Sequence, residues 1–474
     1  MTARLGDCDM RKSFKFYSRG LPSGTARLID AIAYLALRWG RRHLRACNDP
    51  RWRTDALGAA RPFFLARECS FLGPPQNELT EINRRTIRDL LDARRQAWES
   101  GEISLPKEVN VYTRQRVAAQ NGTLAVLMPK YINCTEAAFD HDIAHHVLNS
   151  ALAAGLQAVQ IPADEITYLG SRNLSAQLTA LEGVLARLRP SVIAVDGNFL
   201  PNGRTIDTNI LHSLKGKFGF KIVNVVGDCY DHGADTLGYW HQVADLSVIF
   251  HRYNRHFDKI QDKSTVLVAP TVPFHEPTFC PDETAERDFD LSYVGSRNSR
   301  NRSLFIEAAM SRGVEGFVCF HDRRRDTAPT LPEYASILKR SKMVFTNGWI
   351  DSGEDIITGR AGEAILAGAC LIHEVGSPIS EYLVPFVHYL PVANLAQFVA
   401  FCQFLAQDDE RRSYIANAGR EFWLKNYSSD AFWATVFRRL GEFKEGDQAM
   451  TATPAIARDC GGTSTTIAWH ANDK

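Results

Sequence analysis

The chain has 474 residues, a length that favours two or three domains because a single hydrophobic core seldom grows so large. Its formal net charge of +1 excludes a general attraction for nucleic acid or for an anionic membrane. The ten cysteines are scattered, with no CxxC pair and no histidine at metal-ligand spacing. This usage predicts reduced thiols in a cytoplasmic protein and excludes a disulfide framework or a zinc site. The N-terminus lacks the apolar core of a signal peptide, and no run reaches the roughly 18 apolar residues of a membrane span.

Residues 1–120 are predicted to form a basic, mainly helical extension, because they hold 22 Lys and Arg against 13 Asp and Glu. Apolar residues recur along one side of a first helix, at Leu28, Ile32, Leu35 and Trp39. A second helix is predicted over "ELTEINRRTIRDLLDARRQAWES" and begins near Thr80. A docking helix with a solvated outer face is the favoured interpretation. Contact with a membrane surface through the basic first helix is the less favoured alternative.

Residues 121–275 alternate short apolar runs with helical patterns. The runs are "TLAVLMP", "LQAVQIP", "SVIAVDGN", "KIVNVVGDC", "LSVIF" and "TVLVAP". Continuous apolar strands separated by helices are typical of a parallel sheet that is covered on both faces. This segment is therefore predicted to be a Rossmann-like domain.

Four prolines then mark a linker, and the same alternation restarts over residues 285–440. The predicted strands are "LSYVGS", "GFVCF", "MVFTN", "ACLIHE" and "VHYLP". The fold class is therefore predicted to be α/β, with two Rossmann-like doubly wound domains and a ligand cleft at the carboxyl edges of their strands. The Thr- and Ala-rich tail, residues 445–474, is predicted to be disordered.

A glycine turn followed by arginines lies at the end of the first strand of the second domain, in "YVGSRNSRNRSLF". Gly295 and Ser296 allow a close approach to the backbone, and the arginines are Arg297, Arg300 and Arg302. Guanidinium groups beside a helix start suit a phosphate or diphosphate. Exposed arginines in loops are also common without any ligand, and this interpretation stays open.

Two acids separated by seven residues flank a glycine-bearing loop further on, in "DIITGRAGE". Glu363, in the first turn of the predicted helix, could accept hydrogen bonds from the vicinal hydroxyls of a ribose. Asp355 could hold hydroxyls of a second sugar, and Gly359 and Arg360 stand between the acids. The alternative is that Glu363 only complements the helix dipole.

This arrangement resembles the C-terminal, nucleotide-sugar-binding domain of GT-B-type glycosyltransferases (glycosyl transferases group 1), and in particular the spore-maturation-protein-like subgroup. The family carries Glu-x7-Glu, and this chain has Asp355 in place of the first Glu. "VGSRNSRNR", "LPEYASILKRSKMVFTN" and "ERRSYIANAGREFWLKNYSSDAFW" carry the rest of the likeness, which spans residues 290–440. The resemblance implies that Glu363 binds the donor ribose and that Asp355, near the donor sugar, is catalytic.

Strand ends of the first domain offer candidates for the acceptor side: Tyr131, Asp196, Asn198 and Asp228. Asp228 is the predicted general base if the reaction inverts, although an aspartate at a strand end is as often a cap or turn former. His141, His145 and His146 are interpreted as solvated or core histidines, because no third metal ligand accompanies them.

The predicted function is a metal-independent, hexosyltransferase-like glycosyltransferase that needs no cofactor. It would transfer a sugar from a nucleotide-diphosphate-sugar donor to an unidentified glycan, lipid or protein acceptor. A sugar-nucleotide epimerase of the same architecture is one alternative. A non-catalytic protein that binds a nucleotide sugar or a partner is the other.

Overall fold

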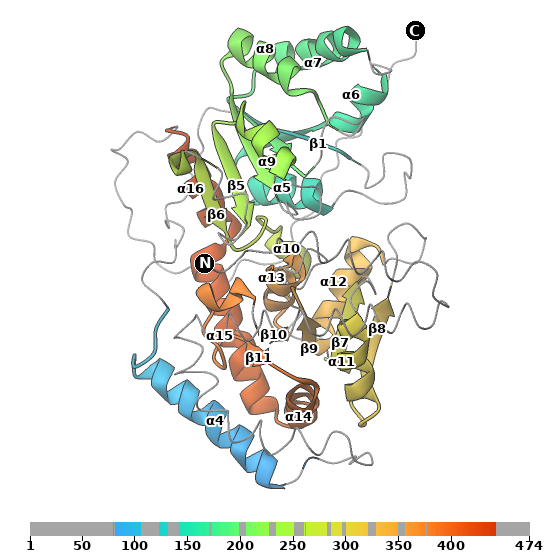
Figure 1. The fold of residues 1–474 in the computed structure, drawn as a ribbon, viewed down its shortest axis with the longest axis vertical. Helices are drawn as coiled ribbons and strands as arrows, with labels where there is room; N and C mark the ends of the chain where they lie inside the picture. The colour runs from blue at the N-terminus through green and yellow to red at the C-terminus, as the bar shows by residue number, and fades with distance from the viewer. Residues whose placement is uncertain are drawn as a thin grey trace, which may run out of the picture.

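The computed structural model describes most of the chain between residues 79 and 441. The described residues are 79, 81–105, 123–130, 142–169, 173–198, 205–226, 234–250, 260, 262–281, 286–295, 300–320, 329–348, 356–375 and 377–441. Helical residues 82, 142, 168–169, 234–237 and 300–303 are described by their backbone alone. Two α/β units lie one above the other in Figure 1, each built on a parallel sheet, and this confirms the predicted fold class of two Rossmann-like domains.

The first unit is built on a six-stranded parallel sheet in the order β2-β1-β3-β4-β5-β6. Its strands are β1 (Thr123–Met128), β2 (Gln157–Pro162), β3 (Val192–Asp196), β4 (Lys221–Val226), β5 (Leu246–Phe250) and β6 (Val266–Ala269). Its helices are α5 (Asp142–Ala153), α6 (Ala163–Leu169), α7 (Leu174–Leu188), α8 (Thr208–Phe218) and α9 (Ala234–His241), and a 3-10 turn, η4, spans Lys263–Thr265. Helices cover both faces of the sheet, so β3 and β5 are buried along their whole length.

The second unit has a five-stranded parallel sheet in the order β11-β10-β9-β7-β8. Its strands are β7 (Phe289–Gly295), β8 (Gly316–Phe320), β9 (Ser341–Thr346), β10 (Cys370–Glu374) and β11 (Leu390–Val392). Its helices are α11 (Arg300–Met310), α12 (Leu331–Lys339), α13 (Gly359–Leu366), α14 (Leu395–Leu405) and α15 (Asp409–Tyr427), with a 3-10 turn, η5, at Pro378–Glu381. The strand order reverses between β7 and β9, and the crevice at such a reversal is where doubly wound sheets bind ligands.

The last helix among the described residues, α16 (Ser429–Arg439), returns to the first unit and packs on α5. The indole Nε1–H of Trp433, on α16, donates a hydrogen bond to Ser150 Oγ, on α5, at 3.0 Å. The short helix α10 (Glu276–Phe279) lies in the linker, where the Glu276 carboxylate accepts hydrogen bonds from the N–H of Ser429 at 2.6 Å and its hydroxyl at 2.7 Å. One hydrophobic cluster consequently runs through both units.

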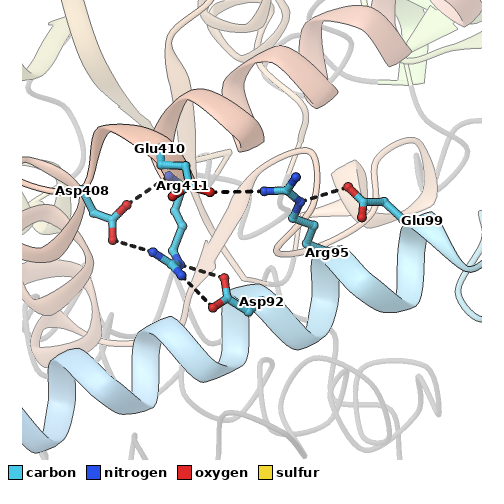
Figure 2. A network of polar contacts seen from close by, with 6 residues as sticks. All are labelled: Asp92, Arg95, Glu99, Asp408, Glu410 and Arg411. Atoms are coloured by element: carbon cyan, nitrogen blue, oxygen red, sulfur yellow. Dashed lines mark hydrogen bonds and ion pairs between the residues drawn. The ribbon is translucent and has the colours of Figure 1, made fainter.

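Helix α4 (Glu81–Glu99) lies along the second unit, beside α14 and α15 (Figure 1). Ile87 on its inner face is fully buried in the cluster that backs the second sheet. Figure 2 shows the polar contacts at its edge, where Arg411 bonds Asp92 in bidentate fashion at 2.8 and 2.7 Å. Arg95 bridges Glu99 and Glu410. The helix is thus held mainly by its apolar face, since partly exposed ion pairs stabilise little.

The last predicted strand, "VHYLP", is shifted in the structure, where β11 begins only at Leu390. Phe386 has a positive φ of 63°, and the Val384 N–H donates to His388 Nδ1 at 3.1 Å, so these residues form a turn instead of a strand. Within the described residues, no helix combines the length and apolarity needed to cross a bilayer. The predictions for residues 1–78 and for the tail, 445–474, lie outside the described residues.

Candidate functional site

Helix α13 lies in the central region between the two units (Figure 1), and the candidate site is built around its first residues. Thr358 at the N-cap position makes no side-chain hydrogen bond to the first turn. Gly362 allows close packing, since a Cβ there would lie 2.5 Å from Phe274 Cε2 and 2.9 Å from Trp423 Cζ2. The first-turn N–H groups are therefore not capped by Thr358, and such groups bind anions well.

Glu363 projects from the first turns of α13 and meets side chains from both units. The hydroxyl of Tyr334, on α12, donates to Glu363 Oε2 at 2.7 Å. His146 Nε2, on α5 of the first unit, lies 3.7 Å from Glu363 Oε1. The side chains of His146 and Glu363 are only 2% and 13% exposed. The Tyr334 hydroxyl therefore orients one oxygen of this carboxylate, and the buried His146 ring lies close to the other.

Arg360 extends the same set of contacts toward the second sheet. Its guanidinium lies beside the side chain of Tyr334 and 5.1 Å from the centre of the Tyr293 ring. Burial acts to lower the pKa of Arg360, but Tyr293, Tyr334 and Glu363 outweigh it, and the pKa lies above its ordinary value. Arg360 therefore remains a cation, and its buried Nη1 has no hydrogen-bond partner in the described part of the chain.

Gly295 ends β7 at the point where the strand order reverses. A Cβ at this position would lie 2.5 Å from Nη2 of Arg360 and 2.9 Å from the hydroxyl of Tyr293, so any side chain would displace the guanidinium. The structure therefore brings together four predicted donor-binding residues, Gly295, Gly359, Arg360 and Glu363, with Tyr334 between the cation and the carboxylate.

The remaining predicted site residues are placed less fully. Arg300 and Arg302 lie in the first turn of α11, but their side chains are not described. The predictions for the other residues fall outside the described residues, and these are Asp355, Asp228, Ser296, Arg297, Tyr131 and His141. Asp196 and Asn198 are buried at the end of β3, where Asp196 Oδ1 accepts the Asn198 N–H at 2.9 Å and so forms a local turn.

Two residues of the site were not identified from the sequence. Tyr334 is a single aromatic residue on a helix, and no motif singles it out. His146 stood out only as one of a pair of adjacent histidines, and it was interpreted as solvated or core. It is indeed buried, but it faces Glu363 of the other unit. In the described ranges, no group of three or more His, Cys, Asp or Glu side chains is arranged to hold a metal ion.

Comparison with known proteins finds one family model that matches part of the chain, mainly in the second unit. Residues 297–438 match the family model described as "Glycosyl transferase-like". The match includes α12 and α13 and covers less than half of the chain. The comparison with curated proteins finds no match.

Solved structures with a similar fold are distant in sequence. Sucrose-phosphate synthase from Thermosynechococcus elongatus is 11% identical, with 68% of this chain and 99% of that chain covered at a TM-score of 0.48. HepE from Anabaena, in complex with UDP and glucose, is 10% identical, with 68% and 100% covered at a TM-score of 0.47. UDP-GlcNAc 2-epimerase from Methanocaldococcus jannaschii is 10% identical, with 63% and 98% covered at a TM-score of 0.38. At these values the likenesses assign no role to individual residues.

Proposed function

We propose that the protein is a glycosyltransferase that transfers a sugar, a hexose in the simplest case, from a nucleotide-diphosphate-sugar donor to a glycan, lipid or protein acceptor. The observation that carries the proposal is the chain of contacts Arg360–Tyr334–Glu363 beside Gly295, in a domain that matches a glycosyltransferase-like family. It offers a cation and a carboxylate at fixed positions, and a nucleoside diphosphate carries both an anionic and a hydroxyl-bearing part. Membership of the spore-maturation-protein-like subgroup belongs to the same proposal.

In the proposed arrangement, the diphosphate lies against Arg360 and the start of α13. When the bond between the anomeric carbon and the leaving phosphate oxygen breaks, negative charge builds up on that oxygen. A buried guanidinium and oriented N–H groups stabilise this charge without reorganising. The charge on the diphosphate is thereby met by the protein's own groups, and the proposal invokes no metal or cofactor.

The ribose is proposed to bind Glu363, whose carboxylate retains acceptor positions after it accepts the Tyr334 hydroxyl. Asp355 is proposed to act on the transferring sugar, and Asp228 to accept the proton of the acceptor hydroxyl if the reaction inverts. A cytoplasmic location is part of the same proposal, supported by buried thiols such as Cys370 and Cys402.

The test begins with a thermal-shift screen of the purified protein against ADP, CDP, GDP and UDP. A ligand present at about 100 times its dissociation constant stabilises the folded state by about 2.7 kcal/mol. Glu363→Ala should then weaken binding of the selected nucleotide by about 1.5–3 kcal/mol, the range of charge-assisted hydrogen bonds. Glu182→Ala is the matched control, because Glu182 lies on α7 and pairs with Lys217.

The nucleotide sugars of the selected base are then incubated with the protein, and donor hydrolysis or transfer is followed. Release of free sugar or transfer to an acceptor is the expected result. If an epimerised nucleotide sugar forms without any acceptor, the protein is an epimerase and the proposed transferase function is wrong. Binding without turnover of any donor would leave a non-catalytic nucleotide-sugar-binding protein.

A further inference from the structure

The contact between His146 and Glu363 joins the two units. It involves a buried nitrogen, Nε2 of His146, that makes no hydrogen bond to the described residues. His146 is 2% exposed, yet its Nε2 has no hydrogen-bond partner in the described part of the chain. Glu363 Oε1 lies 3.7 Å away, which is beyond hydrogen-bond distance. A buried polar atom without a partner is costly, so such atoms are rare and call for an explanation.

The hydrogen bonds around the imidazole indicate where its proton lies. The backbone N–H of His275 points at His146 Nδ1, at 3.5 Å, so Nδ1 acts as the acceptor. In the neutral ring the proton is then on Nε2, the nitrogen that faces Glu363. The rings of Phe274 and Phe279 lie with their centres 5.3 and 5.7 Å from that of His146 and fix its orientation. The site thus presents a fixed N–H donor and a fixed carboxylate acceptor that do not reach each other.

A hydroxyl group satisfies both atoms, because it accepts a hydrogen bond through its oxygen and donates one through its proton. Tyr334 already occupies Oε2 of Glu363, which leaves Oε1 for a ligand. We propose that His146 is a second ligand of the donor ribose, and that one ribose hydroxyl is shared between His146 Nε2–H and Glu363 Oε1. This inference rests on the proposed function, and it adds that recognition of the ribose requires both units.

The experiment measures how strongly the protein distinguishes a ribose from a deoxyribose. The ribonucleoside diphosphate selected from ADP, CDP, GDP and UDP is compared with its 2′-deoxy and 3′-deoxy counterparts by calorimetry. His146→Phe removes the N–H donor and keeps a ring of similar shape among Phe274 and Phe279. It should lower the preference for the ribonucleotide by roughly 2- to 13-fold, as expected for the loss of one hydrogen bond. His146→Gln, which can present an N–H at a similar reach, should recover part of that preference.

A matched control is available in the second unit. His388 is also buried, and its Nδ1 also accepts a backbone N–H. Among the described residues, its Nε2 also has no hydrogen-bond partner. His388 stacks on Phe422, and His388→Phe should leave the preference for the ribonucleotide unchanged. The free protein adds an independent readout. Both substitutions replace a buried imidazole that accepts one backbone N–H by an apolar ring, so His146→Phe and His388→Phe should change the Tm by similar amounts.

Each outcome bears on the inference in a different way. A reduced preference in His146→Phe, with a Tm change no larger than that of His388→Phe, supports the shared hydroxyl. A lower Tm with an unchanged preference overturns it, since His146 would then only join the two units. If Glu363→Ala weakens nucleotide binding but His146→Phe does not change the preference, the inference fails while the proposed function stands. If none of the four diphosphates binds, both fail.

Discussion

Tyr334→Phe is the most direct test of the contacts that organise the site. The substitution removes one hydroxyl group, which donates a hydrogen bond to Glu363 Oε2 at 2.7 Å. Glu363 would then lose a group that fixes its side chain before a ligand binds. Ordering one flexible side chain on binding costs about 0.5–1.5 kcal/mol. The expected loss in nucleotide affinity is therefore about 0.5–1.5 kcal/mol, which corresponds to about 2- to 13-fold in Kd.

The assay is calorimetric titration of the nucleoside diphosphate selected by thermal shift into both proteins. Tyr239→Phe is the control, because the Tyr239 hydroxyl also makes a hydrogen bond, accepting the Thr208 N–H at 3.1 Å in the first unit. An affinity equal to that of the wild type in Tyr334→Phe would refute the reasoning. An equal loss in Tyr239→Phe would show that removal of a distant hydroxyl suffices, and it would refute the reasoning as well.

Three further predictions address other parts of the chain. Asp355→Asn should lower turnover far more than nucleotide affinity, whereas Asp355→Glu should stay active; full turnover in Asp355→Asn would contradict a catalytic role. Burial raises the pKa of Glu276 above its ordinary value of 4.5. Protonated Glu276 therefore stabilises the folded state fully below pH 4.5, and this contribution is lost as the pH rises through the raised pKa. The Tm of Glu276→Gln minus the Tm of the wild type should therefore increase from pH 4 to pH 8. A Tm difference that stays constant over this range would argue against the prediction. Arg411→Ala should cost no more than about 1 kcal/mol in urea unfolding and Ile87→Ala about 2–5 kcal/mol; the reverse order would mean that ion pairs hold α4.

The fold could be predicted from the sequence because each strand of a covered parallel sheet must be apolar along its whole length. "SVIAVD" and "MVFTN" carry that property within a few residues, and both became central strands, β3 and β9. The turn at Phe386–His388 was missed because its residues are apolar and aromatic, like those of a strand. The turn is held by the buried His388 ring, which accepts the Val384 N–H, and by backbone hydrogen bonds to the carbonyl oxygens of Val384 and Tyr389.

The candidate site could be predicted only where its residues follow one another along the chain. Glu363 and Arg360 lie in the same helical turn as the loop glycines, so a motif reveals them. Tyr334 reaches Glu363 through the packing of α12 against α13 within the second unit, whereas His146 comes from α5 of the first unit. The contact of His146 with Glu363 depends on how the two units pack together, and no local pattern in a single sequence records that geometry.

The position of α16 has a consequence for how the chain matures. Trp433 is fully buried, and its indole N–H bonds Ser150 on the first unit, although the two residues are 283 positions apart in the chain. The first unit cannot complete its surface during synthesis until α16 has left the ribosome. Until then, the face of α5 that receives Trp433 stays exposed, and a chain that ends before α16 leaves that apolar face open to aggregation.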